Sequence, residues 1–295
     1  MDARSALFDV YGDHLRTWPG LVRGGTPVAA LVRLLAPLGV RSAAVRTAVS
    51  RMVRAGWLEG VRLPAGPGYA LTDRAQQRLD EAAKRIYRTT EEDWDGTWHL
   101  VVVTPPHHRT EREHLHAALR YLGYGLLAPT TWVAARPAPE LDDVLADAGA
   151  AGQRFLAAAE LSARDVVRQA WDLTALAAGY RRFLSDARRA LDERPTATAA
   201  DAFAAQMRLV HSWRQFLKVD PGLPAELLPA DWPGTTAAAW FDEQSARLLP
   251  AARAFVAACL AGTADHDPAP EGLLPCPRPS ETAPSRSMSR TPSRP

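Results

Sequence analysis

Proline, glycine and hydroxyl residues divide residues 26–56 in a way that leaves few folds open to this chain. Thr26 is expected to cap a helix that has Pro27 at its first position. That helix must stop before the turn Pro37–Gly39, because proline and glycine both interrupt helices. Ser42 is expected to cap a second helix, which ends at Gly56. Two helices are therefore joined by a turn of only a few residues.

A strand pair and another helix follow. Residues 57–72 read WLEGVRLPAGPGYALT, which predicts two short strands joined by a Gly/Pro turn. Residues 73–88 show the apolar spacing of an amphipathic helix, and so do residues 5–18. Helix, helix, turn, helix and two-stranded ribbon is the order of a winged helix-turn-helix. We assign such a domain to residues 1–90.

The helix expected over residues 42–54 has two chemically different sides. At about 100° per residue, one side collects the apolar residues Val45, Ala48, Val49, Met52 and Val53. The opposite side collects Arg46, Thr47, Ser50, Arg51 and Arg54. Arginine pairs bidentately with guanine or phosphate, and hydroxyl side chains bind either acceptor. A helix of this kind after a short turn fits the major groove of DNA.

We therefore predict that this helix and the strand pair bind DNA. The predicted contacts are Arg41, Ser42, Arg46, Thr47, Ser50, Arg51, Arg54 and, before the turn between the strands, Arg62. The alternative is that the basic side is only the solvated face of an ordinary helix. The distribution of charge favours DNA. Residues 1–88 carry 14 Lys and Arg against 7 Asp and Glu, a net charge of +7, whereas residues 89–295 carry 21 against 26, a net charge of −5.

Composition narrows the other possibilities. The chain has two cysteines, Cys259 and Cys276, and no CxxC pair, so neither a disulfide framework nor a structural zinc site is expected. No apolar run is long enough to span a membrane, and the first residues do not resemble a signal peptide. We expect a cytoplasmic protein that needs no cofactor.

Residues 91–162 predict a second domain of alternating strands and helices. His99–Val103 is a buried strand, and residues 110–122 form a helix. Two strands over 124–128 and 131–136, a helix over 137–146 and a strand over 154–159 complete the order. The order β-α-β-β-α-β is that of a ferredoxin-like fold.

The remaining residues divide into a helical domain and a tail. Residues 163–262 show helical apolar stripes, with a proline-punctuated loop, VDPGLPAELLPADWPG, before the last helix. Residues 263–295 hold 8 of the chain's 24 prolines together with serines and arginines. Such a composition cannot bury a core, so we expect a disordered tail. The overall prediction is an α+β multidomain protein.

Several longer segments resemble the PaaX family of transcriptional repressors, named for phenylacetic-acid degradation. They include FDVYGDHL (8–15), LVRLLAPLGVRSAAVRTAVSRMVRAGWL (31–58), YALTDRA (69–75), RIY (85–87), DWDGTWHLVVV (93–103) and LRYLGYGLLAPTTWV (119–133). AWDL (170–173), YRRFL (180–184), LVHSWRQFLKVDPGLPAELLPADWPG (209–234) and ARLLP (246–250) continue the resemblance. Because these segments recur in order along most of the chain, the resemblance is more specific than a single motif.

The resemblance implies more than the residue patterns do. It implies a winged helix-turn-helix, a central domain similar to the Cas2 ferredoxin-like fold and a helical C-terminal domain. It also implies a homodimer that binds a near-palindromic operator on double-stranded DNA. Release by an aryl-CoA thioester such as phenylacetyl-CoA is implied as well, but the resemblance assigns no residue to that effector.

Aromatic and basic residues of the last two domains are the candidates for effector binding. An aryl group favours an aromatic pocket, and CoA phosphates favour arginine. The candidates are Tyr124, Trp132, Trp171, Tyr180, Arg181, Arg182, His211 and Arg214, chosen from a wider set that also includes Tyr121 and Trp213. For each one the competing interpretation is an ordinary place in the core or on the surface.

Two further hypotheses stay open from the sequence. The first is a metal-dependent nuclease or hydrolase built on the central domain. Against it, the strand HLVVV is followed by Thr104, Pro105 and Pro106 rather than by a carboxylate ligand. The cluster HHRTEREHLH (107–116) lacks the HExxH pattern, and His114 and His116 do not share a helix face, so no metal or catalytic site is predicted. The second is a DNA-binding protein without any small-molecule effector.

Overall fold

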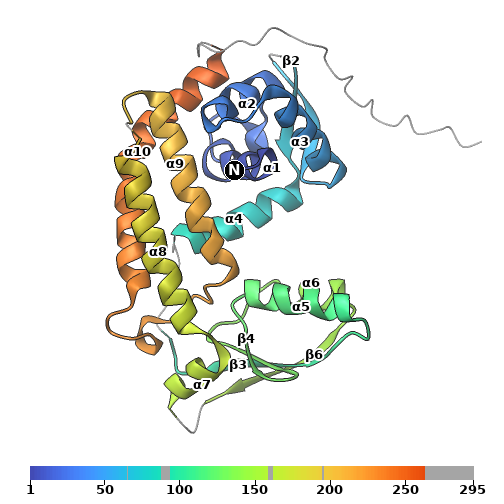
Figure 1. The fold of residues 1–295 in the computed structure, drawn as a ribbon. Coiled ribbons are helices and arrows are strands. Elements are labelled where there is room, and N and C mark those ends of the chain that lie inside the picture. The colour runs from blue at the N-terminus through green and yellow to red at the C-terminus, as the bar shows by residue number, and fades with distance from the viewer. Residues whose placement is uncertain (65, 88–93, 159–161, 195, 263–295) are drawn as a thin grey trace, which may run out of the picture.

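The computed structural model describes the chain except for residues 65, 88–93, 159–161, 195 and 263–295. The tail predicted over 263–295 therefore lies outside the described residues. Figure 1 shows three groups of elements: the N-terminal helices with a small sheet, a second sheet with its helices, and a set of long helices alongside both. No helix in the described ranges is long and apolar enough to cross a membrane.

The N-terminal group contains the helices and strand pair that the sequence predicts. Its elements are α1 (Ala3–Val10), the π-helical turn η1 (Tyr11–Leu15), the short turn η2 (Val22–Gly24), α2 (Val28–Leu35), η3 (Ala36–Leu38), α3 (Ser42–Arg54), β1 (Leu58–Leu63), β2 (Gly66–Leu71) and α4 (Asp73–Tyr87). Strands β1 and β2 pair antiparallel. The helix predicted over 5–18 is in fact α1 followed by the wider turn η1.

Both predicted helix caps are wrong by one residue. Pro27 rather than Thr26 is the N-cap of α2, because the backbone of Thr26 pairs with Tyr69 of β2 at 2.9 and 3.0 Å. The Thr26 hydroxyl donates instead to the Gly24 carbonyl. In α3 the N-cap is Arg41, and Ser42 is the first helical residue. A single tertiary bridge is enough to move such a boundary.

The second group has the predicted β-α-β-β-α-β order. Its elements are β3 (Trp98–Thr104), α5 (Arg109–Tyr121), β4 (Gly125–Ala128), β5 (Thr131–Ala134), α6 (Leu141–Asp147) and β6 (Ala151–Ala157). The sheet order is β4-β5-β3-β6, with all neighbours antiparallel. The last strand begins three residues before the predicted 154, because the alanine- and glycine-rich sequence gives little pattern there.

Alternation along β3 divides the core of this sheet into two layers. Val101 and Val103 pack with Leu115 of α5 on one face, where α6 also contributes. Trp98 packs on the opposite face with Val167 of α7 (Ala163–Ala170). Figure 1 accordingly shows α5 and α6 on one side of the sheet and α7 on the other. The strand predicted to be buried therefore contacts helices on both faces.

The third group is helical and shares its core with the N-terminal group. Its long helices are α8 (Leu173–Asp192), α9 (Ala199–Trp213) and α10 (Pro233–Ala261), with short turns η4 (Arg214–Lys218) and η5 (Ala225–Leu227) between the last two. Phe203 and Met207 of α9, with Val256 and Cys259 of α10, pack in one cluster with α1, α2 and α3. Ile86 of α4 packs in a second cluster with α8, α9 and α10. The helical group therefore packs against helices from the distant N-terminal part of the sequence.

Candidate nucleic-acid interface and adjoining cavity

Helix α3 buries the side that its sequence periodicity indicates. Val45, Ala48, Val49 and Met52 are buried, and Val53 is half-buried. Phe8 of α1 meets Trp57, just after α3, edge to face with ring centroids 4.6 Å apart. These contacts hold α3 by its apolar side and leave its other side on the surface.

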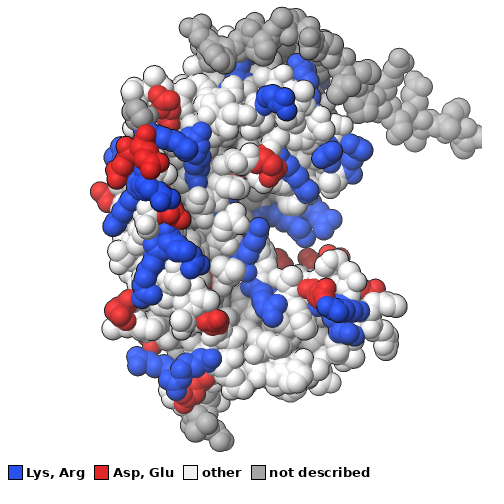
Figure 2. Space-filling model, in the orientation of Figure 1, with Lys and Arg blue, Asp and Glu red and all other residues white. Residues whose placement is uncertain are grey.

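The exposed side of α3 is basic. Arg41, Thr47, Arg51 and Arg54 are exposed, and Ser42, Arg46 and Ser50 are half-buried. Within the part of the chain that the structure describes, none of the four arginines of this side forms an ion pair. Figure 2 shows basic side chains on the upper right of the molecule, where Figure 1 places α3. An arginine without a carboxylate partner keeps its full positive field for an anionic ligand.

Two side chains of this surface are turned back along the helix. The Thr47 hydroxyl donates to the Ala43 carbonyl at 2.9 Å, and Arg54 Nε donates to the Ser50 carbonyl at 3.4 Å. Arg51 has no such contact among the described residues and stands between them. A bound anion would therefore have to reorient Thr47, whereas Arg51 is already available.

The strand pair places one more predicted residue beside this helix. Gly56 follows the end of α3 with a φ of 69°, a conformation that residues with a side chain rarely adopt. The chain then turns into β1. Thr72, at the end of β2, donates its hydroxyl to the Gly56 carbonyl at 2.8 Å. Arg62 is exposed on β1 opposite Pro67 of β2. The hairpin is thus fixed against the end of α3 and carries Arg62 outward.

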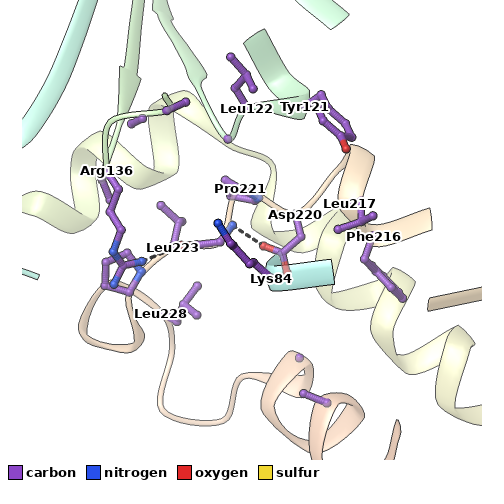
Figure 3. A pocket seen from close by; sticks show the side chains of 18 of the residues that line it. Lys84, Tyr121, Leu122, Arg136, Phe216, Leu217, Asp220, Pro221, Leu223 and Leu228 are labelled. Atoms are coloured by element: carbon purple, nitrogen blue, oxygen red, sulfur yellow. Dashed lines mark hydrogen bonds between the residues drawn. The ribbon is translucent and has the colours of Figure 1, made fainter. Parts of the chain in front are cut away.

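A cavity of about 660 Å³ lies where α4, the second sheet group and the helical group meet. Its aromatic lining is Tyr121, Tyr180, Trp213, Phe216 and Trp232. Two basic side chains, Lys84 of α4 and Arg136 after β5, also line it (Figure 3). The cavity therefore combines aromatic surface with cationic groups that come from other elements.

The aromatic side chains of the cavity are held in fixed positions. Tyr180 stacks on Phe216 with ring centroids 4.1 Å apart and planes 13° apart. Its hydroxyl donates to Asp220 Oδ2, while Asp220 Oδ1 accepts from the Gly222 amide at 2.8 Å. Arg136 Nη1 reaches the Gly222 carbonyl at 3.4 Å. Such order reduces the entropy cost of placing a flat ligand here.

Lys84 differs from these aromatic groups because it is exposed. Its ammonium lies 2.7 Å from Glu81 of the same helix. The hydrogen bond to Glu81 raises the pKa of Lys84, so the group is cationic at neutral pH. It is therefore a partly solvated cation among the residues that line the cavity.

The structure separates the eight candidate effector residues. Tyr180 lines the cavity. Tyr124 and Trp132 are buried in the core of the second sheet, and Trp171 stacks near Trp98 at 6.1 Å between centroids. These three residues do not line the cavity, because the aromatic spacing that indicates a pocket indicates a core equally well.

The four basic candidates also lie away from the cavity. Arg181 and Arg182 are exposed on α8, and His211 and Arg214 contact aspartates of the N-terminal group. The residues that sequence reasoning missed are Lys84, Arg136, Phe216 and Trp232. The signal for Trp232 was the proline-punctuated loop over 219–234, since long loops in compact domains are often functional.

A short turn, a helix with a basic exposed side and an adjoining strand pair are typical of DNA-binding domains. Family models match almost the whole described chain: the PaaX-like protein model matches residues 2–75, the PaaX protein central Cas2-like domain 91–170 and the PaaX-like protein C-terminal domain 171–258. The Transcriptional repressor PaaX of Escherichia coli (strain K12) is 33% identical over 287 residues, which cover 91% of this chain and 87% of that protein. The chain therefore belongs to the PaaX family, and its central domain is Cas2-like.

A solved structure agrees with this assignment. The Uncharacterized protein Rv0674 from Mycobacterium tuberculosis is 27% identical, with a TM-score of 0.58. The match covers 86% of this chain and 98% of that one. The similarity therefore extends over all three groups of elements.

Proposed function

We propose that this protein is a transcriptional repressor that binds double-stranded DNA through α3 and the β1–β2 hairpin, acting as a winged helix-turn-helix. The observation that carries the proposal is the basic side of α3, which has no carboxylate partner among the described residues while its apolar side is buried. The name of the Escherichia coli relative, a transcriptional repressor, supports the same function.

In this proposal the domains are residues 1–90 for DNA binding, 91–162 for the central domain and 163–262 for a helical effector and dimerisation domain. A homodimer presents two copies of α3 to the halves of a near-palindromic operator, about 34–36 Å apart. Because the chromosome is its target, we place the protein in the cytoplasm.

We further propose that an aryl-CoA thioester, such as phenylacetyl-CoA, occupies the cavity and releases the DNA. The volume of about 660 Å³ suits a ligand of this class, since such pockets span about 300–1,000 Å³. The stacked rings of Tyr180 and Phe216 suit the aryl group, and Lys84 and Arg136 suit the CoA phosphates. In the earlier candidate set, Arg181, Arg182 and Arg214 held this last role, which their positions do not support.

The test is binding of the purified protein to DNA from upstream of its own gene, with and without phenylacetyl-CoA, free CoA or phenylacetate. We expect specific binding that weakens steeply with salt, because arginine–phosphate contacts release counterions. Phenylacetyl-CoA should weaken it further, and the two fragments should not. Salt-insensitive or absent DNA binding would overturn the repressor proposal, and a response to none of the three compounds would overturn the effector proposal.

The nuclease alternative finds no support. Thr104 ends β3 and two prolines follow, so no carboxylate stands after that strand. Across the described ranges, no group of three His, Cys, Asp or Glu side chains is placed to hold a metal ion. We therefore propose no enzymatic activity.

A further inference from the structure

The junction between α9 and η4 faces two different parts of the molecule. Trp213 and Phe216 line the cavity. His211 and Arg214, from the same two turns, instead contact the N-terminal group. A displacement of this junction by a ligand therefore displaces both sets of contacts together, because the four residues share one short stretch of helix.

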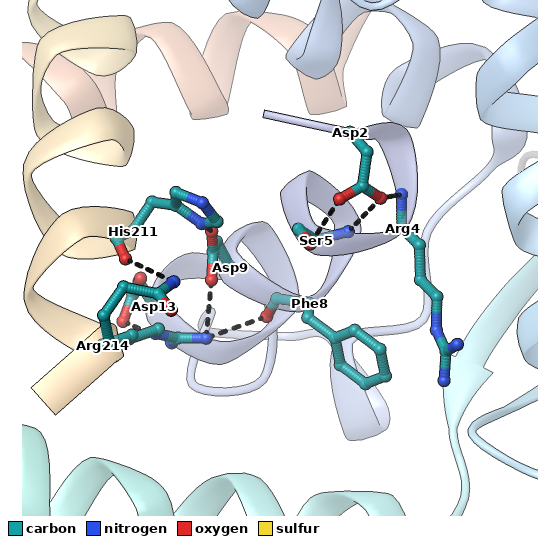
Figure 4. A network of polar contacts seen from close by, with 9 residues as sticks. Asp2, Arg4, Ser5, Phe8, Asp9, Asp13, His211 and Arg214 are labelled. Carbon is teal, nitrogen blue, oxygen red and sulfur yellow. Dashed lines mark hydrogen bonds and ion pairs between the residues drawn. The ribbon is translucent and has the colours of Figure 1, made fainter. Parts of the chain in front are cut away.

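The contacts with the N-terminal group form a largely buried network of charged and polar side chains, the Arg214 network: Asp9, Asp13, His211 and Arg214. Arg214 reaches Asp9 Oδ1 at 2.9 Å and Asp13 Oδ1 at 3.0 Å. His211 Nδ1 lies 2.8 Å from Asp9 Oδ2 (Figure 4). The side chains of Asp9 and Asp13 are 4% and 3% exposed, and that of Arg214 is 13% exposed. Charges this buried depend on one another, since removing one leaves another unpaired in a poorly solvated site.

The backbone of η1 is shaped to receive Arg214. A Cβ atom on Gly12 would lie 2.3 Å from Arg214 Nη2, which is far inside contact distance. Only glycine at position 12 allows the guanidinium to lie this close to the turn. π-Helical turns are uncommon and occur frequently at functional sites. Here the turn brings Asp13 round to the arginine that Asp9 also holds.

The same turn is joined to the DNA-facing elements. Tyr11 donates its hydroxyl to the Tyr69 carbonyl of β2 at 3.0 Å. Arg16, just after the turn, donates to the Gly12 carbonyl at 2.6 Å and pairs with Asp80 of α4. The turn η1 therefore contacts the hairpin on one side and the Arg214 network on the other.

Helix α4 makes a second connection to the cavity. Trp213 Nε1 donates to the Ile86 carbonyl of α4 at 3.3 Å. Glu81, which follows Asp80 directly, and Lys84, one turn after it, line the cavity. A ligand that moves Trp213 or Lys84 therefore acts on η1 from two directions.

We propose that the Arg214 network and η1 form the element that couples the cavity to the DNA-binding surface. Ligand in the cavity shifts the α9–η4 junction, which moves Arg214 relative to Asp9 and Asp13 and so changes how α1 holds the hairpin and α3. This inference rests on the proposed function. It adds which residues carry the regulation.

Two variants test the network without truncating it. Asp13→Asn removes one charge and keeps the shape, and Gly12→Ala adds a methyl group where Arg214 lies while changing no charge. Asp186→Asn is the matched control, because its ion pair with Arg189 is exposed on α8, at 66% and 67%. Allosteric coupling typically amounts to about 5–150-fold in affinity. The measured quantity is the factor by which phenylacetyl-CoA weakens operator binding. Wild type and control should show the same factor.

In Asp13→Asn and Gly12→Ala we expect that factor to fall to about twofold or less. The affinity for phenylacetyl-CoA should stay within about threefold of the wild-type value, because the variants lose the coupling and not the binding site. Calorimetry gives the ligand affinity, and fluorescence anisotropy gives the operator affinity. If both variants keep the wild-type factor, the coupling proposal is overturned while the proposed function stands. Circular dichroism establishes that each variant is folded.

A second measurement needs no ligand, and therefore judges the network even if the effector is a different molecule. Phe216→Leu perturbs the cavity side of the junction and should change operator affinity in the wild-type background. In the Asp13→Asn background the same substitution should have less than half that effect on the logarithm of the operator affinity, because the ion pair between Arg214 and Asp13 is absent. Independent effects of the two substitutions would contradict the proposal, since uncoupled sites are additive.

Discussion

Arg51 and Arg214 occupy similar local settings and opposite electrostatic ones. Both lie in helical segments among apolar residues, so a helical wheel treats them alike. Arg51 is exposed on α3, and among the described residues it has no carboxylate partner. Arg214 is nearly buried and touches two aspartates. The function of an arginine is therefore set by what its guanidinium meets, and only one of these two is left to meet something outside the chain.

The difference also explains why one role is visible in the sequence and the other is not. The basic side of α3 is defined by residues within one helix, whose relative positions follow from its period. The partners of Arg214 lie 205 and 201 positions away in the sequence. No local pattern contains that information, so phosphate binding was the natural expectation for Arg214.

The largest expected effect concerns the buried arginine. Arg214→Ala should lower the free energy of unfolding by about 3–5 kcal/mol, because it leaves Asp9 and Asp13 buried without their cation. Arg189→Ala, which removes an exposed arginine on α8, should cost about 0–1 kcal/mol. Urea unfolding followed by circular dichroism compares the two. Equal losses would mean that burial does not distinguish these arginines.

The arginines on the basic side of α3 should show the reverse pattern. Arg46→Ala and Arg51→Ala should each weaken operator binding by about 1–3 kcal/mol, if they read base edges, and leave the unfolding midpoint unchanged. Arg181→Ala, an exposed arginine on the distant helix α8, is the control and should bind as the wild type does. A gel-shift titration measures the affinities. Should both α3 variants bind normally, the basic side would be only a solvated surface.

These cases show how far the sequence leads. It predicted the bounds of α3 closely, because a 13-residue amphipathic helix between a Pro-Leu-Gly turn and Gly56 has strong local signals. It also predicted the β-α-β-β-α-β order. It missed the start of α2, where a tertiary bridge from Thr26 to Tyr69 decides the boundary. Of the wider set of effector candidates only Tyr121, Tyr180 and Trp213 line the cavity, since the cavity is assembled from separate parts of the sequence.

Arg136 provides an intermediate case between the buried and the exposed arginines. It is half-buried at the cavity, where CoA phosphates are proposed to bind. Arg136→Ala should weaken phenylacetyl-CoA binding by about 1 kcal/mol, as for a partly solvated charge contact. Arg182→Ala on α8 should have no effect. Calorimetry measures both affinities. If Arg182→Ala instead of Arg136→Ala weakens phenylacetyl-CoA binding, the CoA phosphates bind at α8 and not at the cavity.

The smallest expected effect concerns His14, which is buried beside Asp13. Burial lowers the pKa of His14, with Asp13 opposing the shift and Arg253 adding to it. The unfolded chain takes up a proton near about pH 6.5, whereas the folded chain stays neutral until a lower pH. The free energy of unfolding is therefore unaffected by the titration of His14 above the unfolded pKa. It decreases as the pH falls from the unfolded pKa toward the lower folded pKa.

Replacing His14 with phenylalanine, which suits its contact with Phe203 at 5.4 Å between centroids, should remove this part of the pH dependence. The measurement is the unfolding free energy of both proteins at about pH 7.5 and pH 5.5, on either side of the unfolded pKa. If the unfolding free energy decreases equally in both proteins between these pH values, His14 does not contribute to the pH dependence.

The central claim, that α3 contacts DNA, is tested most directly by site-specific cross-linking. Thr47→Cys, at the middle of the exposed side, carries a photo-cross-linker in a Cys276→Ser background. Cys259 can stay, because it is buried and burial raises the pKa of its thiol, which disfavours the reactive thiolate. Ser185→Cys on the exposed side of α8 is the control. We predict that light joins the DNA to position 47, at bases whose major groove faces α3, and leaves position 185 unlinked. Cross-linking from position 185 with none from position 47 would contradict the account.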